Sequence, residues 1–335
     1  MPEARARRRH LIDACQYCNW SEKIFRELRE GEVDAIQVTV CYHEDFRETV
    51  ENLIDWNGYF ARFPELIRRA VSTADIDAAQ DSGQTAVLLG LQNASAIEDD
   101  IGLVGILHGL GIRVMQLTYN NQSLLGAGCY ETHDAGITRM GREVIAEMNR
   151  LGMLIDMSHS AERTTLEAID LSARPISVTH ANPASWHRVA RNKSDAVLKA
   201  LAARGGMLGL SLYPLHLKAG SDCTLESFTE MVARLAELIG AAHIGIGSDL
   251  CQDQPDSVVE WMRNGRWTKG SADIGLGKPV FPKQPRWFRD NRDFGRIRDG
   301  LARRGFAEAE IDGIMGDNWY RLFARSFEPQ NLSAG

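Results

Sequence analysis

The sequence lacks the features that mark membrane and exported proteins. None of its apolar runs approaches the roughly 18 residues that a membrane-spanning helix needs. The basic opening MPEARARRRH is followed only by Leu11 and Ile12 before Asp13, whereas an export signal carries an apolar stretch of about 7–15 residues there. Residues 1–10 are therefore expected to form a flexible, solvated arm, and the chain is expected to act in the cytoplasm without a membrane partner.

Cysteine and positive charge are also scarce. Six cysteines in 335 residues are too few and too scattered for a disulfide scaffold, so they are expected to be thiols. The 38 lysines and arginines are outnumbered by 45 acidic residues, and a net charge of −7 argues against a nucleic-acid partner. A hydrophobic content of 44% excludes disorder as the dominant state.

The sequence does contain about eight short apolar runs, most of them continuous rather than alternating. Continuous runs are typical of strands buried on both faces of a parallel sheet. The segments between them read as helices, most clearly 138–151 and 225–239, each with an apolar stripe and a following glycine. The runs are 11–14, 33–41, 85–91, 112–118, 153–157, 175–179, 207–212 and 243–247.

Alternating strands and helices in this number predict an α/β fold, a single (β/α)₈ TIM barrel spanning residues 1–335. An open doubly wound sheet is the alternative, but it would carry a glycine-rich turn after its first strand, and residues 14–20 (ACQYCNW) contain no glycine. The stretch 261–292 is rich in tryptophan, glycine and proline and is expected to form a long loop near the barrel mouth.

Chemistry in such a barrel lies at the carboxyl ends of the strands. Two histidines and an aspartate at three of these ends are what a metal site on the rim would contain, since imidazole and carboxylate groups bind zinc. A lone histidine there is more often a hydrogen-bonded core residue, but two on consecutive strands favour the metal site. The residues at the predicted strand ends include Cys15, Gln92, Tyr119, His159, His180 and Asp249.

Arg191 follows the sixth predicted strand in ANPASWHRVARNKSD and falls on the same rim. An arginine at this place can hold a carboxylate with two parallel hydrogen bonds. The spacing alone equally allows a surface ion pair with Asp195.

Four segments together resemble the membrane (renal) dipeptidase family, a branch of the metal-dependent amidohydrolase barrels. They are GREVIAEMNRLGMLIDMSHS, VTHANPASWHRVARNKSD, GIGSD and GIMGDNWYRLF, within a match from about Leu11 to about Phe323. The resemblance implies a dipeptide-cleaving hydrolase that usually holds two zinc ions and is often a homodimer. It further implies that His159 and His180 bind zinc, that Arg191 binds the substrate carboxylate, and that Asp249 handles the proton of the scissile amide.

The chain departs from the family pattern at the other metal ligands. The family opens with Asp-Gly-His-x-Asp, where this sequence has Asp13 to Tyr17, so Cys15 replaces a ligand histidine and Tyr17 a ligand aspartate. Gln92 stands where the family has the glutamate that bridges both metals, and Tyr119 replaces a histidine that polarises the substrate carbonyl. Two neighbouring divalent ions need anionic ligands, so we expect one zinc ion at most, or none.

Cys15 and Gln92 are further candidate donors for that ion. A thiolate binds zinc well, although Cys15-x-x-Cys18 without a second such pair is weak evidence for a zinc knuckle or a redox dithiol.

Two functions therefore compete. The first is a metal-dependent hydrolase of a dipeptide or similar small amide, in which Asp249 moves the proton, Tyr119 contacts the substrate and its developing oxyanion, and Arg191 binds the terminal carboxylate. The second is a barrel that has lost dipeptidase chemistry and binds or transforms a small carboxylate, such as an N-substituted amino acid.

Overall fold

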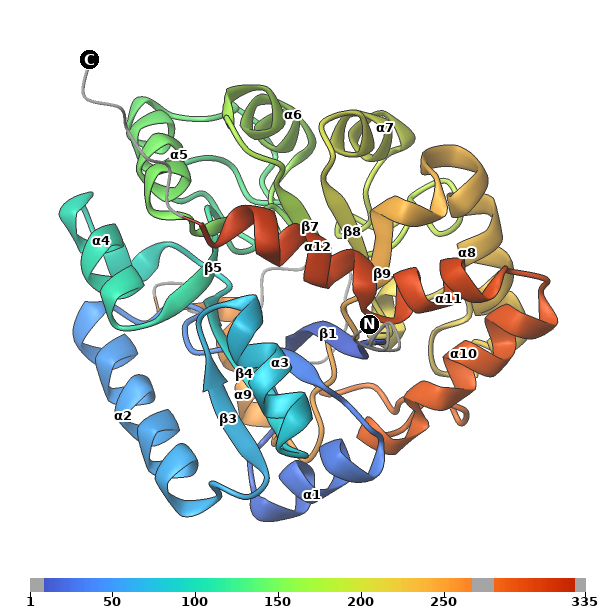
Figure 1. Ribbon diagram of the computed structural model, residues 1–335. Coiled ribbons are helices and arrows are strands. Elements are labelled where there is room, and N and C mark those ends of the chain that lie inside the picture. Colours follow the sequence, from blue (N-terminus) through green and yellow to red (C-terminus); the bar gives the residue numbers. More distant parts are fainter. Residues whose placement is uncertain (1–8, 267–279, 329–335) are drawn as a thin grey trace, which may run out of the picture.

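The computed structural model describes residues 9–266 and 280–328, which form a closed barrel of eight parallel strands (Figure 1). Each strand is hydrogen-bonded to the next, and the pairings of β1 with β9 and of β2 with β4 close the ring. The strands are β1 (Ile12–Gln16), β2 (Ala35–Thr39), β4 (Thr85–Leu91), β5 (Ile112–Gln116), β6 (Leu154–Asp156), β7 (Ser177–Ala181), β8 (Met207–Leu210) and β9 (Ile244–Ile246). The predicted (β/α)₈ barrel and its eight strands are confirmed.

The helices surround the barrel and bury one side against it (Figure 1). They are α1 (Glu22–Glu30), α2 (Phe46–Arg62), α3 (Thr73–Asp81), α4 (Gly102–Gly109), α5 (Arg139–Leu151), α6 (Glu162–Leu171), α7 (Asp195–Ala203), α8 (Leu225–Ile239), α9 (Asp256–Asn264), α10 (Phe294–Arg303), α11 (Glu308–Met315) and α12 (Asp317–Ser326). The predicted helices at 138–151 and 225–239 are α5 and α8. Thr138 and Thr224 accept hydrogen bonds from the first helical turns as N-caps, and Gly152 ends α5 in the left-handed region at φ 81°.

The sequence analysis missed one strand, β3 (Ile67–Ala70), which pairs with the first half of β4 outside the ring. In its sequence IRRA only Ile67 and Ala70 are buried, whereas Arg68 is exposed and Arg69 is half-buried. A strand of four residues with two arginines gives no apolar run to detect.

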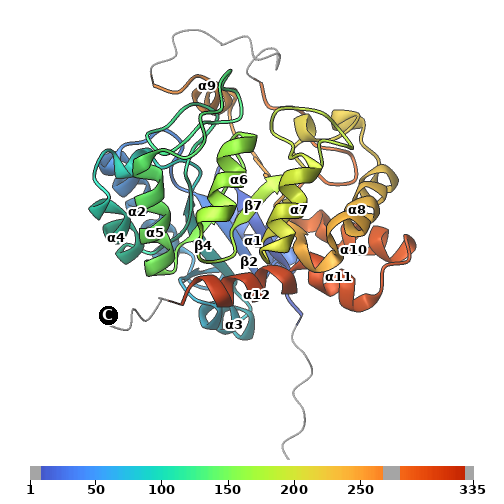
Figure 2. The ribbon, with the colours of Figure 1, turned by 90° about the horizontal axis from the view of Figure 1, so that it is seen from above.

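The two ends of the barrel are covered differently. Helix α12 lies across the amino-terminal end of the strands, and α9 lies at the opposite end, above their carboxyl ends (Figure 2). Trp319 of α12 is fully buried and donates to the backbone oxygen of Ile246 at 2.8 Å, which anchors the closed end of the barrel. The open end at α9 is thus where a substrate can enter.

The predicted N-terminal arm needs a correction at its last residue. Residues 1–8 lie outside the described part of the chain, but His10 is only 6% exposed. Its Nδ1 lies 2.9 Å from a carboxylate oxygen of Asp317, and its ring stacks on Tyr320 with centroids 4.3 Å apart. His10 is therefore part of the closed end of the barrel rather than of a solvated arm.

The stretch 261–292, predicted as one long loop, begins inside helix α9. Val259 and Met262 are buried three residues apart on one face of this helix, which explains why the chain stays helical to Asn264. Residues 280–290 have no helix or strand, and 267–279 lie outside the described residues. Among the helices of the described ranges, none has the length and apolar character needed to cross a bilayer.

Candidate active site

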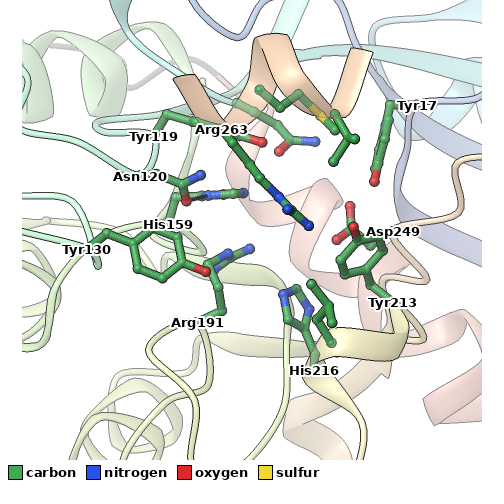
Figure 3. Close-up of a pocket in the computed structure, with 14 residues that line it drawn as sticks. Tyr17, Tyr119, Asn120, Tyr130, His159, Arg191, Tyr213, His216, Asp249 and Arg263 are labelled. Carbon is green, nitrogen blue, oxygen red and sulfur yellow. Dashed lines mark hydrogen bonds between the residues drawn. The ribbon is translucent and has the colours of Figure 1, made fainter. Parts of the chain in front are cut away.

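The structure brings together the residues predicted at the strand ends. Cys15 and His180 belong to β1 and β7, while the other four lie within three residues of the ends of β4, β5, β6 and β9. A pocket opens above them at the carboxyl end of the barrel (Figure 3). Its lining residues are Tyr17, Gln92, Tyr119, Asn120, Tyr130, His159, Arg191, Tyr213, Leu215, His216, Asp249, Val259, Met262 and Arg263.

His159 and His180 face each other through their Nε2 atoms, which are 3.1 Å apart. The Nδ1–H of His159 donates to Oδ1 of Asn120 at 2.7 Å, so its Nε2 carries a lone pair. Burial and the nearby charge of Arg191 lower the pKa of both rings well below the usual range, so neither is protonated at neutral pH.

The orientation of His180 is set by a buried chain of hydrogen bonds from Asp156. Thr179 donates its hydroxyl proton to Oδ2 of Asp156 at 2.6 Å and therefore accepts from Nδ1–H of His180 at 2.8 Å. The Nε2 of His180 is thus a second lone pair facing that of His159. Two lone pairs at this distance repel each other unless a cation lies against both, as in a metal site with oriented imidazoles.

His180 also belongs to a second group of donors. Its ring nitrogen, the Sγ of Cys15 and a carboxylate oxygen of Asp249 all lie within 4.8 Å of one another and are buried. The Nε2 of Gln92 donates to Sγ of Cys15 at 3.3 Å and to Oγ1 of Thr39 at 2.7 Å. Nitrogen, sulfur and carboxylate donors are the set that zinc binds.

Asp249 is held in an unusual backbone conformation for a residue with a side chain, at φ 57°. Its backbone N–H donates to the oxygen of Cys15 at 2.9 Å, and the preceding Ser248 donates its N–H to Asp13 at 2.7 Å. Burial raises the pKa of Asp249 to about 7. A carboxyl group that titrates near neutral pH is suited to accept and return a proton.

Arg191 is a buried residue, 3% exposed, and not a surface one. Its guanidinium donates to the backbone oxygens of Ser158 and of His180, and it lines the pocket beside the two histidines. The alternative of an ion pair with Asp195 is wrong, because that carboxylate accepts from Ser185 at 2.7 Å in a more exposed position.

Tyr119 stacks on the ring of His159 with centroids 4.0 Å apart. Burial raises the pKa of its phenol well above the usual range, so it stays a neutral hydrogen-bond donor. The same factor acts on Cys15 and Cys18: burial raises the pKa of both thiols, which speaks against a reactive redox dithiol.

Sequence reasoning missed several residues of the pocket. His216 and Tyr213 come from the segment after β8, Asn120 and Tyr130 from the long connection after β5, and Arg263 from α9. A histidine shortly after a predicted strand was a usable signal for His216. Arg263 lies in a stretch that was expected to form a loop, so the direction of its side chain could not be predicted from the sequence.

A buried lysine, Lys193, lies next to this site and donates to the backbone oxygen of Ser160 at 2.7 Å. Burial, together with the charge of Arg191, lowers its pKa to about 8 from 10.5, a difference of about 3 kcal/mol in favour of the neutral form. Below pH 8 the folded protein carries this penalty, and it disappears as the pH rises toward 10.5.

Lys193→Met should therefore raise the free energy of unfolding at pH 7 by about 1–2 kcal/mol, because the lost hydrogen bond offsets part of the gain. This gain in the free energy of unfolding over the parent should vanish near pH 10.5. Urea denaturation at both pH values measures this, with Lys199→Met, an exposed lysine on α7, as the control. A Lys193→Met protein less stable than the parent at pH 7 contradicts the prediction.

Comparison with known proteins places this geometry in a family. The model of the membrane dipeptidase family (peptidase family M19) matches residues 20–262. An amidohydrolase from Pseudomonas aeruginosa of known structure is 33% identical, with a TM-score of 0.90 over 95% of this chain and 97% of that one.

Two curated fungal proteins are also similar. Dipeptidase verJ of Clonostachys rogersoniana is 29% identical over 63% of this chain and 55% of its own length. Dipeptidase tcpJ of Claviceps purpurea is 28% identical over 90% of this chain and 64% of its own length. The chain thus spans less than two thirds of either relative. The family model nevertheless covers most of the chain, and the protein belongs to the membrane dipeptidase family, peptidase family M19.

Proposed function

We propose that this protein is a metal-dependent hydrolase that cleaves a dipeptide or a similar small amide. The observation that carries the proposal is the pair of Nε2 lone pairs of His159 and His180, 3.1 Å apart in a buried site. Two imidazole nitrogens bound to one zinc ion at about 2.0–2.1 Å lie roughly 3.3 Å apart in tetrahedral geometry, close to the observed distance.

The donors fit one ion and do not fit two. His180 shares its ring with two groups of donors, since His159 lies on one side of it and Cys15 and Asp249 lie on the other. A second ion would need the anionic ligands that Tyr17 and Gln92 replace, and the amide of Gln92 already donates to Cys15 and Thr39. We therefore propose a single zinc ion per chain, held by His159 and His180, with the thiol of Cys15 on the other side of His180 as a further candidate donor.

A bound zinc ion would supply an acidified water as nucleophile and a positive charge near the scissile carbonyl. The residues of the chain provide the other functions. Asp249 takes a proton from the attacking water and delivers it to the leaving amine. Tyr119, as a neutral phenol beside His159, donates a hydrogen bond to the developing oxyanion. Arg191 binds the terminal carboxylate of the substrate with those N–H groups that do not donate to Ser158 and His180.

We further propose that the protein works in the cytoplasm, as a homodimer. The cytoplasmic assignment is supported by the six cysteines, all of which are free thiols. The dimer is an expectation from the family resemblance, and light scattering of the purified protein tests it.

The metal content of the purified protein, measured together with dipeptide hydrolysis, tests the proposed function. We expect about one zinc ion per chain, and activity that is lost on chelation and restored by zinc. A protein that binds no metal after incubation with zinc, yet binds small carboxylates, would instead fit the alternative of a barrel that has lost dipeptidase chemistry.

A further inference from the structure

The pocket contains more positive charge than the binding of one substrate carboxylate requires. Of its fourteen lining residues, two are arginines, Arg191 and Arg263, and one is acidic, Asp249. The remaining polar groups include four tyrosine phenols, which can donate hydrogen bonds to an anion. Since the proposed function uses Arg191 for the terminal carboxylate, Arg263 needs a separate explanation.

The two arginines reach the pocket from different parts of the fold. Arg191 follows β7 and lies deep in the barrel end, whereas Arg263 comes from α9 and its side chain points from that helix into the pocket (Figure 3). Val259 and Met262 of the same helix are buried against the mouth. Packing of these two apolar side chains fixes α9, and with it the direction of Arg263.

Phenols lie close to both guanidinium groups. The hydroxyl of Tyr213 is hydrogen-bonded to Arg263, and the positive charges of Arg191 and Arg263 both act on Tyr130. A carboxylate between a guanidinium and a phenol receives charge-assisted hydrogen bonds from both groups, the arrangement that holds an anion most firmly in a partly buried site. Arg263 with Tyr213 forms one such pair, and Tyr130 lies in the same pocket within the field of both arginines.

We infer that the pocket is built for a doubly anionic substrate, a small amide that carries two carboxylates, with one bound by Arg191 and the second by Arg263 and Tyr213. For a dipeptide, the second carboxylate is the side chain of an aspartate or glutamate residue. This inference rests on the proposed function for the cleavage of the amide, but the second anion subsite can be tested by binding alone.

Calorimetry with small carboxylates that contain no peptide bond tests the subsite directly. The probes are malonate, succinate and glutarate, each compared with its own monoamide, which has the same size and one carboxylate fewer. We expect the best dicarboxylate to bind at least about 10-fold more tightly than its monoamide. Arg263→Gln should abolish this preference by weakening the dicarboxylate about 10- to 100-fold and leaving the monoamide within about 2-fold. Arg263→Lys should keep part of the preference for the dicarboxylate, because the positive charge remains while the bidentate guanidinium donor is lost.

Arg47→Gln is the control for net charge, because Arg47 lies on α2 with a side chain that is 83% exposed and pairs with Glu51. It should leave both affinities unchanged. The inference is overturned if the parent binds dicarboxylates and monoamides equally. It is also overturned if Arg263→Gln or Arg263→Lys weakens both probe types alike, since Arg263 would then only support the shape of the pocket.

Kinetics separates this inference from the proposed function. The pairs Ala-Glu against Ala-Gln and Glu-Ala against Gln-Ala show which substrate residue carries the second carboxylate, and Arg263→Gln should remove the preference through KM rather than kcat. If dicarboxylates bind as expected but no dipeptide is cleaved, the subsite stands and the hydrolase proposal fails. If dipeptides are cleaved without an acidic preference, the hydrolase stands and the subsite fails.

Discussion

Replacing His180 with asparagine should abolish zinc binding and lower kcat/KM for a dipeptide by more than about 100-fold. Loss of a residue that merely orients a metal ligand already costs about 10- to 100-fold, and His180 belongs to both donor groups, facing His159 on one side and Cys15 and Asp249 on the other. Zinc analysis and steady-state kinetics of the purified variant measure the two effects.

The matched control is the same substitution at the other end of the barrel. His243 precedes β9 and its Nδ1 lies 2.9 Å from the backbone oxygen of Gly206, far from the pocket residues in the fold. His243→Asn should keep zinc content and kcat/KM near those of the parent. A His180→Asn protein that retains one zinc ion per chain would place the ion elsewhere and remove the basis of the proposed site.

The sequence predicted the barrel well because its strands are buried on both faces. Such strands are mostly apolar, as β4 is from Ala86 to Leu91, so they stand out as continuous runs. The outer strand β3 escaped detection because only two of its four residues are buried. The position of His10 was missed because its partners Asp317 and Tyr320 lie some 300 residues away in the sequence. No local sequence pattern indicates such distant contacts.

The candidate site was predictable only where it is attached to strands. Cys15, His159, His180 and Asp249 could be found because a barrel collects the carboxyl ends of its strands on one rim. Arg263 and Tyr130 reach the same pocket from a helix and a loop, whose direction depends on packing such as that of Met262. The burial of Arg191 likewise depends on the backbone oxygens around it, which the spacing to Asp195 could not reveal.

Replacing Asp249 with asparagine should lower kcat by about 10²- to 10⁴-fold, the usual contribution of a positioned proton carrier. The same variant should be more stable than the parent in the metal-free state above pH 7. Burial raises the pKa of this carboxyl to about 7 from 3.8, so its ionised form destabilises the folded parent at high pH. That penalty is absent below pH 3.8, grows as the pH rises to 7, and is fully present above it, where it corresponds to a few kcal/mol.

Asp253→Asn is the matched control for this pair of opposite effects. Asp249 and Asp253 follow the same strand and share a left-handed backbone, with φ values of 57° and 61°, which asparagine also tolerates. Asp253 is exposed and pairs with Lys23 at 2.6 Å, so its replacement should leave kcat unchanged and alter stability by no more than about 1 kcal/mol. Steady-state kinetics of the zinc-loaded protein measures the effect on kcat. Thermal unfolding of the metal-free protein at pH 5 and pH 8 measures the effect on stability. Lower activity with higher stability at pH 8 marks Asp249 as a group kept at a cost for its chemistry. A variant that loses activity and stability together would show that Asp249 acts by holding the loop after β9 in place.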